Sequence, residues 1–174
     1  SLAAVRSSST VEDVGKFDFS GQHSSYLRVT EENLPGAIKS CWASLFTPSS
    51  IVYRTKAKIP KGKKQSMAVL VQKFIEASVS GIASTRNPVT DESEIFIEYV
   101  EGDCEPLASG RSTGKIARVT QSTLDLPDNR WKDTMLRVAQ TCKDIETVFN
   151  YPQDIEWAVD KTGELYILQS RPLR

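Results

Sequence analysis

The feature that most constrains this chain is its last stretch, residues 152–171, which reads PQDIEWAVDKTGELYILQSR. Within it, residues 153–159 and 165–169 alternate in side-chain character and are rich in β-branched and aromatic residues, a pattern typical of strands. Between them, residues 160–163 (DKTG) have the composition of a tight turn in which Gly163 can take a positive φ. The sequence therefore predicts a β-hairpin.

The turn also suggests a register for this hairpin. We expect Ala158 to lie opposite Leu165. The pairs that follow from this register are Ile167 with Glu156 and Gln169 with Asp154. Because strand side chains alternate, one face then carries four polar residues: Asp154, Glu156, Gln169 and Arg171. The other face, which we expect to be buried, carries Trp157, Val159, Tyr166 and Leu168.

Two carboxylates, an amide oxygen and a guanidinium on one face are suited to binding a divalent cation and a phosphate. Mg²⁺ prefers oxygen ligands, and arginine donates two parallel hydrogen bonds to phosphate oxygens. A cross-strand salt bridge on a solvated face explains the same pattern. The pattern alone leaves both interpretations open.

Composition argues against several classes of function. Lysine plus arginine number 22 and aspartate plus glutamate number 22, so the formal net charge is zero. A neutral chain lacks the broad positive field that captures nucleic acid or membranes, and we expect neither partner. No apolar run is long enough to span a membrane, and three cysteines without a CxxC spacing, beside a single histidine, make a poor zinc set. We expect free thiols in a cytoplasmic protein.

The N-terminal part contains two candidate phosphate contacts. The chain begins in a strand-like stretch without a methionine, so we expect a fragment of a longer protein. Arg6 leaves this strand into four hydroxyl residues and can hold a phosphate, although a surface arginine before a polar loop explains it as well. Residues 15–21 (GKFDFSG), which include Ser20 and Gly21, form a loop bounded by glycines that can bring backbone N–H groups close to phosphate oxygens.

A candidate base-binding segment lies near the middle of the chain. An apolar run at residues 67–71 leads into a mixed polar and apolar link: Gln72, Lys73, Phe74 and Ile75. Adenine-binding hinges are built in this way, because backbone groups of the link meet the edge of the base while apolar side chains cover its faces.

The remaining pattern predicts the fold class. Apolar residues recur at helical spacing over residues 30–46, with Thr30 as the N-cap and Trp42 in the core, and over residues 131–149. Further strands are expected at residues 81–85 and 94–100. We therefore expect an α+β fold, a mainly antiparallel sheet with covering helices, in which residues 1–174 make up one partial domain.

Five segments, in this order, resemble the nucleotide-binding domain of the phosphoenolpyruvate synthase and pyruvate phosphate dikinase family. They are AVRSSSTVEDV (4–14), FSGQHSSYLRV (19–29), CWASLFTPSSIVYR (41–54), VLVQKFIEASVSGIASTRNPVT (69–90) and PQDIEWAVDKTGELYILQSRP (152–172). The DIEWA and LQSRP pieces are highly specific. The third segment is nearer the synthase and rifampin phosphotransferase branch than the dikinase branch.

The resemblance implies an ATP-grasp fold, in which two α+β lobes close on ATP. In this family the phosphate passes from ATP to a histidine on a swivelling domain, and another domain transfers it to pyruvate, or to rifampin in the antibiotic-modifying relatives. The resemblance assigns Mg²⁺ to Glu156 and Gln169, and the phosphates to Arg6 and Arg171. It also assigns adenine to residues 72–75 and the phosphate-covering loop to Ser20 and Gly21; Asp154 is taken as a further cofactor contact.

Three departures from the family pattern stand out. We expect residues 1–174 not to include the family's upstream lobe, which carries a lysine that contacts ATP phosphates, or its phosphohistidine and acceptor domains. His23 does not match the phosphoacceptor motif. The glycine-rich GLGE segment of the family appears here as Gly102-Asp103-Cys104-Glu105, with two positions changed.

Three hypotheses for the function follow. The first is the ATP-binding fragment of a phosphoenolpyruvate synthase-like phosphotransferase, inactive on its own, with pyruvate phosphate dikinase and rifampin phosphotransferase as related alternatives. The second is a nucleotide-sensing module that has lost catalysis, which the changed residues 102–105 suggest. The third is an unrelated α+β binding domain with a charged hairpin.

Overall fold

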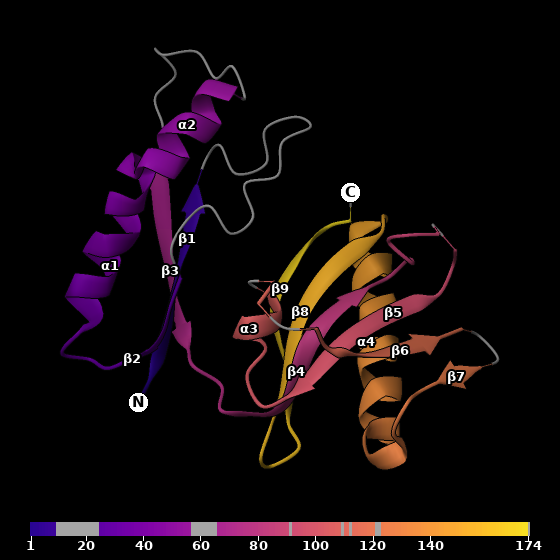
Figure 1. Ribbon diagram of the computed structural model, residues 1–174. Helices are drawn as coiled ribbons and strands as arrows, with labels where there is room; N and C mark the ends of the chain where they lie inside the picture. The colour runs from indigo at the N-terminus through magenta and orange to yellow at the C-terminus, as the bar shows by residue number, and fades with distance from the viewer. Residues whose placement is uncertain are drawn as a thin grey trace. The chain divides into compact units, whose positions relative to one another are not determined.

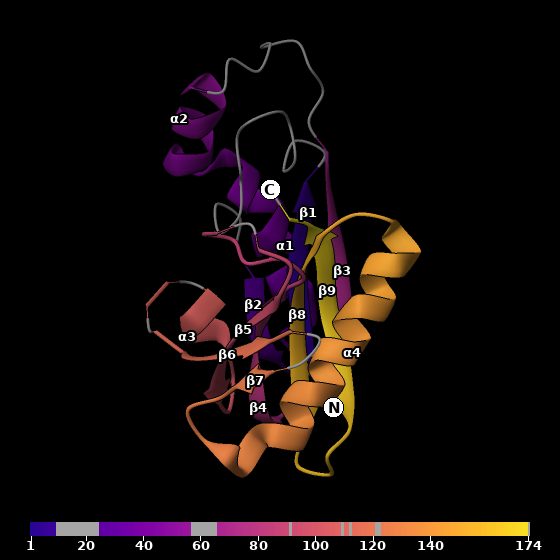
Figure 2. The ribbon, with the colours of Figure 1, turned by 90° about the vertical axis from the view of Figure 1, so that its right-hand side faces the viewer.

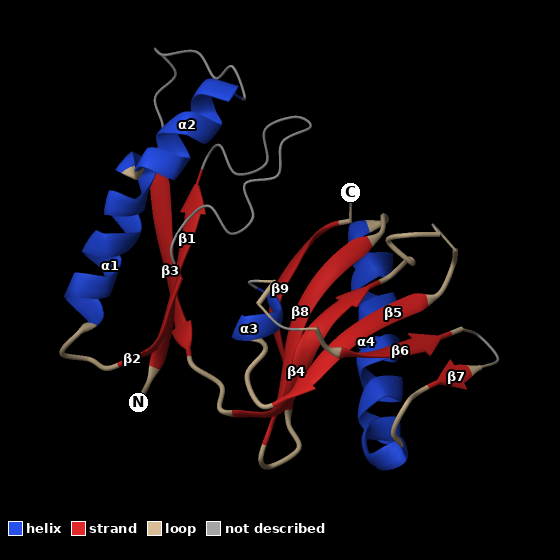
Figure 3. Ribbon diagram, in the orientation of Figure 1, coloured by secondary structure: helices blue, strands red, loops and turns tan. Residues whose placement is uncertain are grey.

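The computed structural model describes residues 1–9, 25–56, 66–90, 92–108, 110–111, 113–120 and 123–173. The chain forms two compact units, Ser1–Phe74 and Ile75–Arg174 (Figure 1). Each unit contains one antiparallel sheet and one or more helices, which confirms the expected α+β class (Figure 3). The ATP-grasp assignment and the single partial domain over residues 1–174 stay predictions. No described helix is long and apolar enough to cross a membrane.

The first unit is a small sheet with helices. Its elements are β1 (Ala3–Ser9), β2 (Ser25–Val29), α1 (Leu34–Ala43), a 3₁₀ turn η1 (Ser44–Phe46), α2 (Pro48–Lys56) and β3 (Met67–Lys73). The strand order is β2-β1-β3, and both pairings are antiparallel. Val5, Val29 and Cys41 form the buried core, against which Ile38 of α1 and Val69 of β3 pack.

Two expectations for α1 are wrong. The helix begins at Leu34 rather than beside Thr30, since Pro35 lacks an N–H and is tolerated only in the first turn. Trp42 is 49% exposed and is not a core residue. It follows the buried Cys41 by one residue, which places it about 100° further round the helix and away from the sheet.

The second unit is a six-stranded antiparallel sheet with one long helix. Its elements are β4 (Ala77–Ser84), β5 (Ile95–Glu101), α3 (Glu105–Ala108), β6 (Lys115–Val119), β7 (Leu124–Asp125), η2 (Asn129–Trp131), α4 (Lys132–Phe149), β8 (Gln153–Asp160) and β9 (Leu165–Pro172). The strand order is β7-β6-β5-β4-β8-β9. Helix α4, expected at residues 131–149, lies along one face of this sheet (Figures 1 and 2). The other face carries the polar residues of the terminal hairpin.

Gly81 makes the centre of this sheet possible. It is paired with Tyr99 on β5 and with Trp157 on β8, and both of these large side chains are completely buried. A Cβ atom on Gly81 would lie 2.1 Å from the Glu98 carbonyl oxygen and 2.9 Å from the Tyr99 Cα, both backbone atoms. The absent side chain therefore lets β4 and β5 approach each other between the two rings.

The expected turn of the terminal hairpin is confirmed. The Asp160 Oδ1 atom accepts hydrogen bonds from the Thr162 N–H (2.8 Å), the Thr162 hydroxyl (2.6 Å) and the Glu164 N–H (3.0 Å). Gly163 has a φ of +87°, as a tight turn requires. The hydrogen bond from the Thr162 hydroxyl is the main cause that lowers the pKa of the Asp160 carboxyl.

We expect Gly81→Ala to lower the free energy of unfolding by about 2–3 kcal/mol, because two backbone strands must separate to admit the methyl group. Urea unfolding followed by tryptophan fluorescence measures this. Gly36→Ala is the control, because a Cβ atom at this position would meet nothing within 4 Å. Gly36 lies in helix α1, where alanine is favoured over glycine, so this variant should be more stable than wild type by about 0.5–1 kcal/mol. Equal stability of Gly81→Ala and wild type would contradict the close approach.

We expect Asp160→Asn to lower the urea midpoint at pH 7, because the turn loses a charged acceptor. The folded-state pKa of Asp160 lies below its ordinary value of 3.8, so its stabilisation is present above that value and is lost as the pH falls through the folded-state pKa. The difference in midpoint between the two proteins should therefore close as the pH falls from about 5 through the folded-state pKa. A difference that persists in acid would rule out the charge as its cause.

Candidate functional site

The register of the terminal hairpin differs from the expected one. Glu156 lies opposite Gln169 and Asp154 lies opposite Arg171, whereas Ala158 lies opposite Tyr166. The pairing shifts between Glu156 and Trp157, where β9 has one extra residue, a β-bulge. The expected pairs of Ile167 with Glu156 and of Gln169 with Asp154 are therefore wrong.

The expected polar face is nevertheless correct. The pairing at the turn differs from the expectation by one residue and the bulge adds a second, so Gln169 moves by two residues, which keeps its side chain on the same side of the sheet. Directly opposed residues share a face, so four side chains of β8 and β9 lie together on the face away from α4: Asp154, Glu156, Gln169 and Arg171. We call these four residues the polar cluster.

The opposite face of the hairpin is mostly as expected. Ile155, Trp157 and Val159 are buried in the core with residues of α4. Tyr166 is an exception, because it lies opposite Ala158 on the same face as the polar cluster, where its hydroxyl donates to the Asp160 Oδ2 atom at 3.3 Å. The pairing at the turn, Val159 with Leu165, places Leu165 on the core side and Tyr166 on the other. Leu168, also expected in the core, is the extra residue of the bulge and is not part of the core cluster.

One half of the polar cluster is an ion pair. The Arg171 Nε and Nη2 atoms donate to the Asp154 Oδ2 atom at 2.9 and 2.8 Å, and the side chain of Asp154 is only 15% exposed. The Ser84 hydroxyl on β4 donates to the Asp154 Oδ1 atom at 3.2 Å. The salt-bridge interpretation is thus correct for Asp154 and Arg171.

The other half of the cluster is built from oxygen donors. Glu156 is half-buried between Ile82 on β4 and Gln169 on β9, and Gln169 is exposed. Opposed side chains of antiparallel strands have Cβ atoms about 5 Å apart, so one cation can reach a carboxylate and an amide oxygen placed in this way. Among the described residues no three acidic, cysteine or histidine side chains form a metal cluster. A cation held here would take its remaining ligands from a substrate or from water.

The expected adenine hinge lies at the edge of the other sheet. Within the described residues β3 pairs only with β1, and the Phe74 N–H donates to the Leu2 carbonyl at 2.9 Å. Because inter-strand hydrogen bonding alternates along an antiparallel pair, the N–H and C=O groups of Lys73 point away from β1. Gln72 and Lys73 end β3, and the boundary between the two units falls between Phe74 and Ile75.

An arginine supports this hinge. The Arg28 guanidinium lies 4.7 Å from the centre of the buried Phe74 ring. Arg28 has a φ of +55°, a left-handed conformation that is rare for a residue other than glycine, asparagine or aspartate. Its place beside the hinge was not predicted, since nothing local in the sequence marks a left-handed arginine.

The other expected phosphate contacts have different outcomes. Arg6 lies on β1, opposite Leu70 on β3, and shares a face with Gln72, whose partner is Ala4. Ser20 and Gly21 lie outside the described residues, as does His23. The structure thus brings together the polar cluster in the second unit, and Arg6 with Gln72 in the first.

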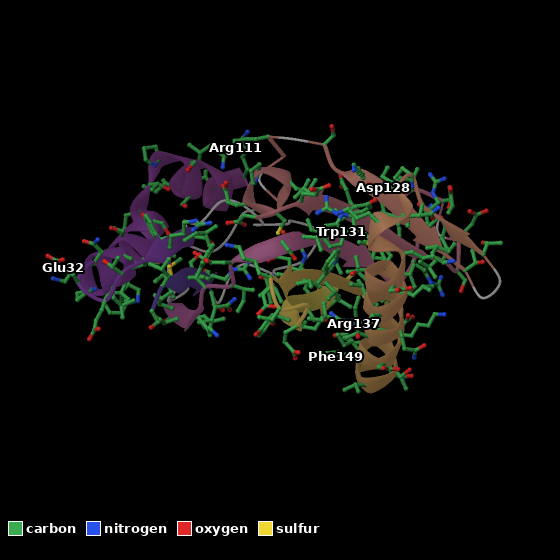
Figure 4. The ribbon with its side chains drawn as sticks, turned by 90° about the horizontal axis from the view of Figure 1, so that it is seen from below. Glu32, Arg111, Asp128, Trp131, Arg137 and Phe149 are labelled. Atoms are coloured by element: carbon green, nitrogen blue, oxygen red, sulfur yellow. The ribbon has the colours of Figure 1, made fainter. Side chains whose placement is uncertain are left out.

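A surface cavity of about 430 Å³ lies elsewhere on the second unit. It opens at the turn end of the hairpin and is lined by Trp131, Arg137, Asp160 and Lys161. Figure 4 labels Trp131 and Arg137. The polar cluster lies at the opposite end of the same strands. The cavity is therefore separate from the candidate site.

Comparisons with known proteins identify the family of this chain. The family model described as "Pyruvate phosphate dikinase, AMP/ATP-binding domain" matches residues 1–131 and 116–174. A probable phosphoenolpyruvate synthase from Archaeoglobus fulgidus is 33% identical over 209 positions, which cover 98% of this chain and 26% of the relative. The phosphoenolpyruvate synthase of Pyrococcus furiosus is also 33% identical, over 98% of this chain and 26% of its own length.

A rifampicin phosphotransferase from Bacillus cereus is 33% identical over 98% of this chain and 23% of its own length. The chain therefore spans about a quarter of the length of the relatives it matches. Because the family model matches both parts of the chain, the resemblance inferred from the sequence is confirmed. The chain belongs to the family of pyruvate phosphate dikinase AMP/ATP-binding domains.

Proposed function

We propose that this chain is the Mg-ATP-binding part of a phosphoenolpyruvate synthase-like phosphotransferase, built on a partial ATP-grasp domain. The whole protein would convert ATP, pyruvate and water into AMP, phosphoenolpyruvate and phosphate, through a phosphohistidine on a separate swivelling domain. The observation that carries the proposal is the polar cluster, in which a carboxylate, an amide and an ion-paired arginine share one sheet face. Membership of an AMP/ATP-binding family supports the nucleotide.

The metal role falls to Glu156 and Gln169. Mg²⁺ in phosphoryl-transfer sites is held by one or two protein oxygens and completes its octahedron with water and phosphate oxygens. Opposed positions on β8 and β9 supply one charged and one neutral oxygen ligand of this kind. The ion, when bound, neutralises charge on the phosphate oxygens and so favours transfer.

The phosphate role falls to Arg171 and Arg6. Phosphoryl transfer needs positioning and charge stabilisation more than covalent chemistry, and a planar guanidinium supplies both. Arg171 is held by two hydrogen bonds to Asp154, which supports a guanidinium of fixed orientation at this position. We assign the loop that contains Ser20 and Gly21 to cover the phosphates, as the family resemblance implies.

The base role falls to residues 72–75. The outward N–H and C=O groups of Lys73 offer one donor and one acceptor, the pair that the Watson–Crick edge of adenine requires. The buried Phe74 ring supports the apolar side of this hinge. Recognition through backbone groups would make the Lys73 side chain dispensable for the choice of base.

The final acceptor is the least constrained part of the proposal. Relatives of equal identity include a phosphoenolpyruvate synthase and a rifampicin phosphotransferase, so pyruvate and rifampicin are both candidates for the acceptor domain. A nucleotide-sensing module without catalysis is a second candidate. It is supported by residues 102–105, where Cys104 is buried and the Asp103 carboxylate accepts from the Glu105 N–H. Formation of a phosphohistidine from ATP in the full-length protein separates the two.

We expect Glu156→Ala and Arg171→Ala to weaken Mg-ATP binding by the full-length protein about tenfold to a hundredfold, as loss of a charged contact does. Isothermal titration calorimetry measures this. Glu98→Gln is the matched control, because Glu98 lies on the same face, one strand beyond Ile82, and a glutamine still accepts from the Gly114 N–H. Undiminished binding by both alanine variants would remove the assigned roles.

We expect metal binding to depend on the nucleotide, because the two proposed ligands, Glu156 and Gln169, leave most of the octahedron to water and phosphate oxygens. Mn²⁺, observed by electron paramagnetic resonance, should bind weakly to the full-length protein and tightly once a non-hydrolysable ATP analogue is added. Gln169→Ala should weaken that ternary complex about tenfold. Tight Mn²⁺ binding without nucleotide, unchanged by Glu156→Ala, would show that other residues hold the metal.

A further inference from the structure

A row of interacting side chains crosses the second sheet beside the proposed metal ligands. From β6 to β9, successive strand pairings align Arg118, Phe96, Ser84, Asp154 and Arg171. The Ser84 hydroxyl is bonded to one oxygen of Asp154, and two N–H groups of Arg171 are bonded to the other. Asp154 is therefore held from both neighbouring strands.

We propose that Asp154 is a positioning residue that orients the Arg171 guanidinium, with the Ser84 hydroxyl fixing Asp154 in turn, and that Asp154 does not itself contact nucleotide or metal. The inference rests on the phosphate role proposed for Arg171. Both carboxylate oxygens of Asp154 already accept hydrogen bonds from the protein. Only 15% of its side chain is exposed, against 40% for Arg171, so the arginine is the more accessible of the two to a ligand.

The geometry of the pair explains how the orientation works. Asp154 accepts from the Nε and Nη2 atoms, which form one edge of the planar guanidinium. Binding along that edge fixes the plane and turns the Nη1 corner away from Asp154. A long arginine side chain otherwise loses rotational freedom when it meets a phosphate, and prior fixation removes that cost.

The same pair separates the charges of the polar cluster. Asp154 and Glu156 are two residues apart on β8 and share a face, so their carboxylates would repel each other. Arg171 balances the charge of Asp154. Glu156 lies in the neighbouring row opposite Gln169, where we assign the cation, so two acids that the sequence pattern treats alike have different tasks.

A double-mutant cycle in the full-length protein tests the inference by titration with Mg-ATP. Asp154→Asn should weaken binding about fivefold to tenfold when Arg171 is present and by less than about twofold in the Arg171→Ala protein. The Mg²⁺ concentration for half-maximal binding should stay unchanged in Asp154→Asn, whereas Glu156→Ala should raise it. A merely structural role would not produce this dependence on Arg171.

Ser84→Ala provides a second route, because it keeps the ion pair and removes a single hydroxyl. It should weaken binding about twofold to threefold, again only when Arg171 is present, and it carries the test if Asp154→Asn fails to fold. Additive losses in either cycle, or a shifted Mg²⁺ requirement in Asp154→Asn, would overturn the inference and leave the proposed function intact. Unchanged ATP binding by Arg171→Ala alone would overturn both.

Discussion

The register of β8 against β9 is the constraint on which the candidate site depends. Glu156 and Gln169 can share a ligand only if they lie opposite each other on one face, and Arg171 can be held only if it meets Asp154. The β-bulge after Glu156 sets both pairs at once, because it absorbs one residue between the turn and the cluster. Without that extra residue, the observed pairing at the turn would place Glu156 opposite Leu168 and not opposite Gln169.

Burial on the reverse face holds this register in place. Ile155 and Trp157 are completely buried against α4, and they alternate along β8 with Asp154 and Glu156. A slip of one residue would turn the two carboxylates into the core, and burying unpaired charge costs far more than any hydrogen bond gained. Gly81 contributes from the neighbouring strand β4, since its missing side chain leaves room for the backbone of β5 at Glu98 and Tyr99. Burial of Ile155 and Trp157 on one side of β8 therefore determines that Asp154 and Glu156 lie on the other.

The sequence was sufficient to predict whatever depends on local periodicity. The hairpin, its Asp160 turn and the membership of the polar face follow from alternation and turn chemistry, which act within a few residues. The exact pairs do not, because alternation fixes neither the first pair after the turn, which is Val159 with Leu165, nor the position of a bulge. The contact from Ser84 to Asp154 joins residues 70 apart in sequence and requires the order of the strands. Trp42 was misplaced for a related reason, since helical spacing alone does not tell which residues beside the apolar stripe reach the core.

The salt-bridge and the ligand-site interpretations of the hairpin do not compete, because each applies to a different pair of opposed residues. Asp154 and Arg171 form the ion pair in one row, while Glu156 and Gln169 present two oxygens in the next. The pair is partly buried, and the loss of hydration offsets much of the attraction between its charges, so stability is a weak reason for one at this position. Its effect on orientation is larger, because a guanidinium held along one edge offers its remaining donors in a fixed direction. Glu156, in the neighbouring row between Ile82 and Gln169, supplies the carboxylate that we assign to the cation, while the Arg171 of the ion pair is assigned to the polyanion.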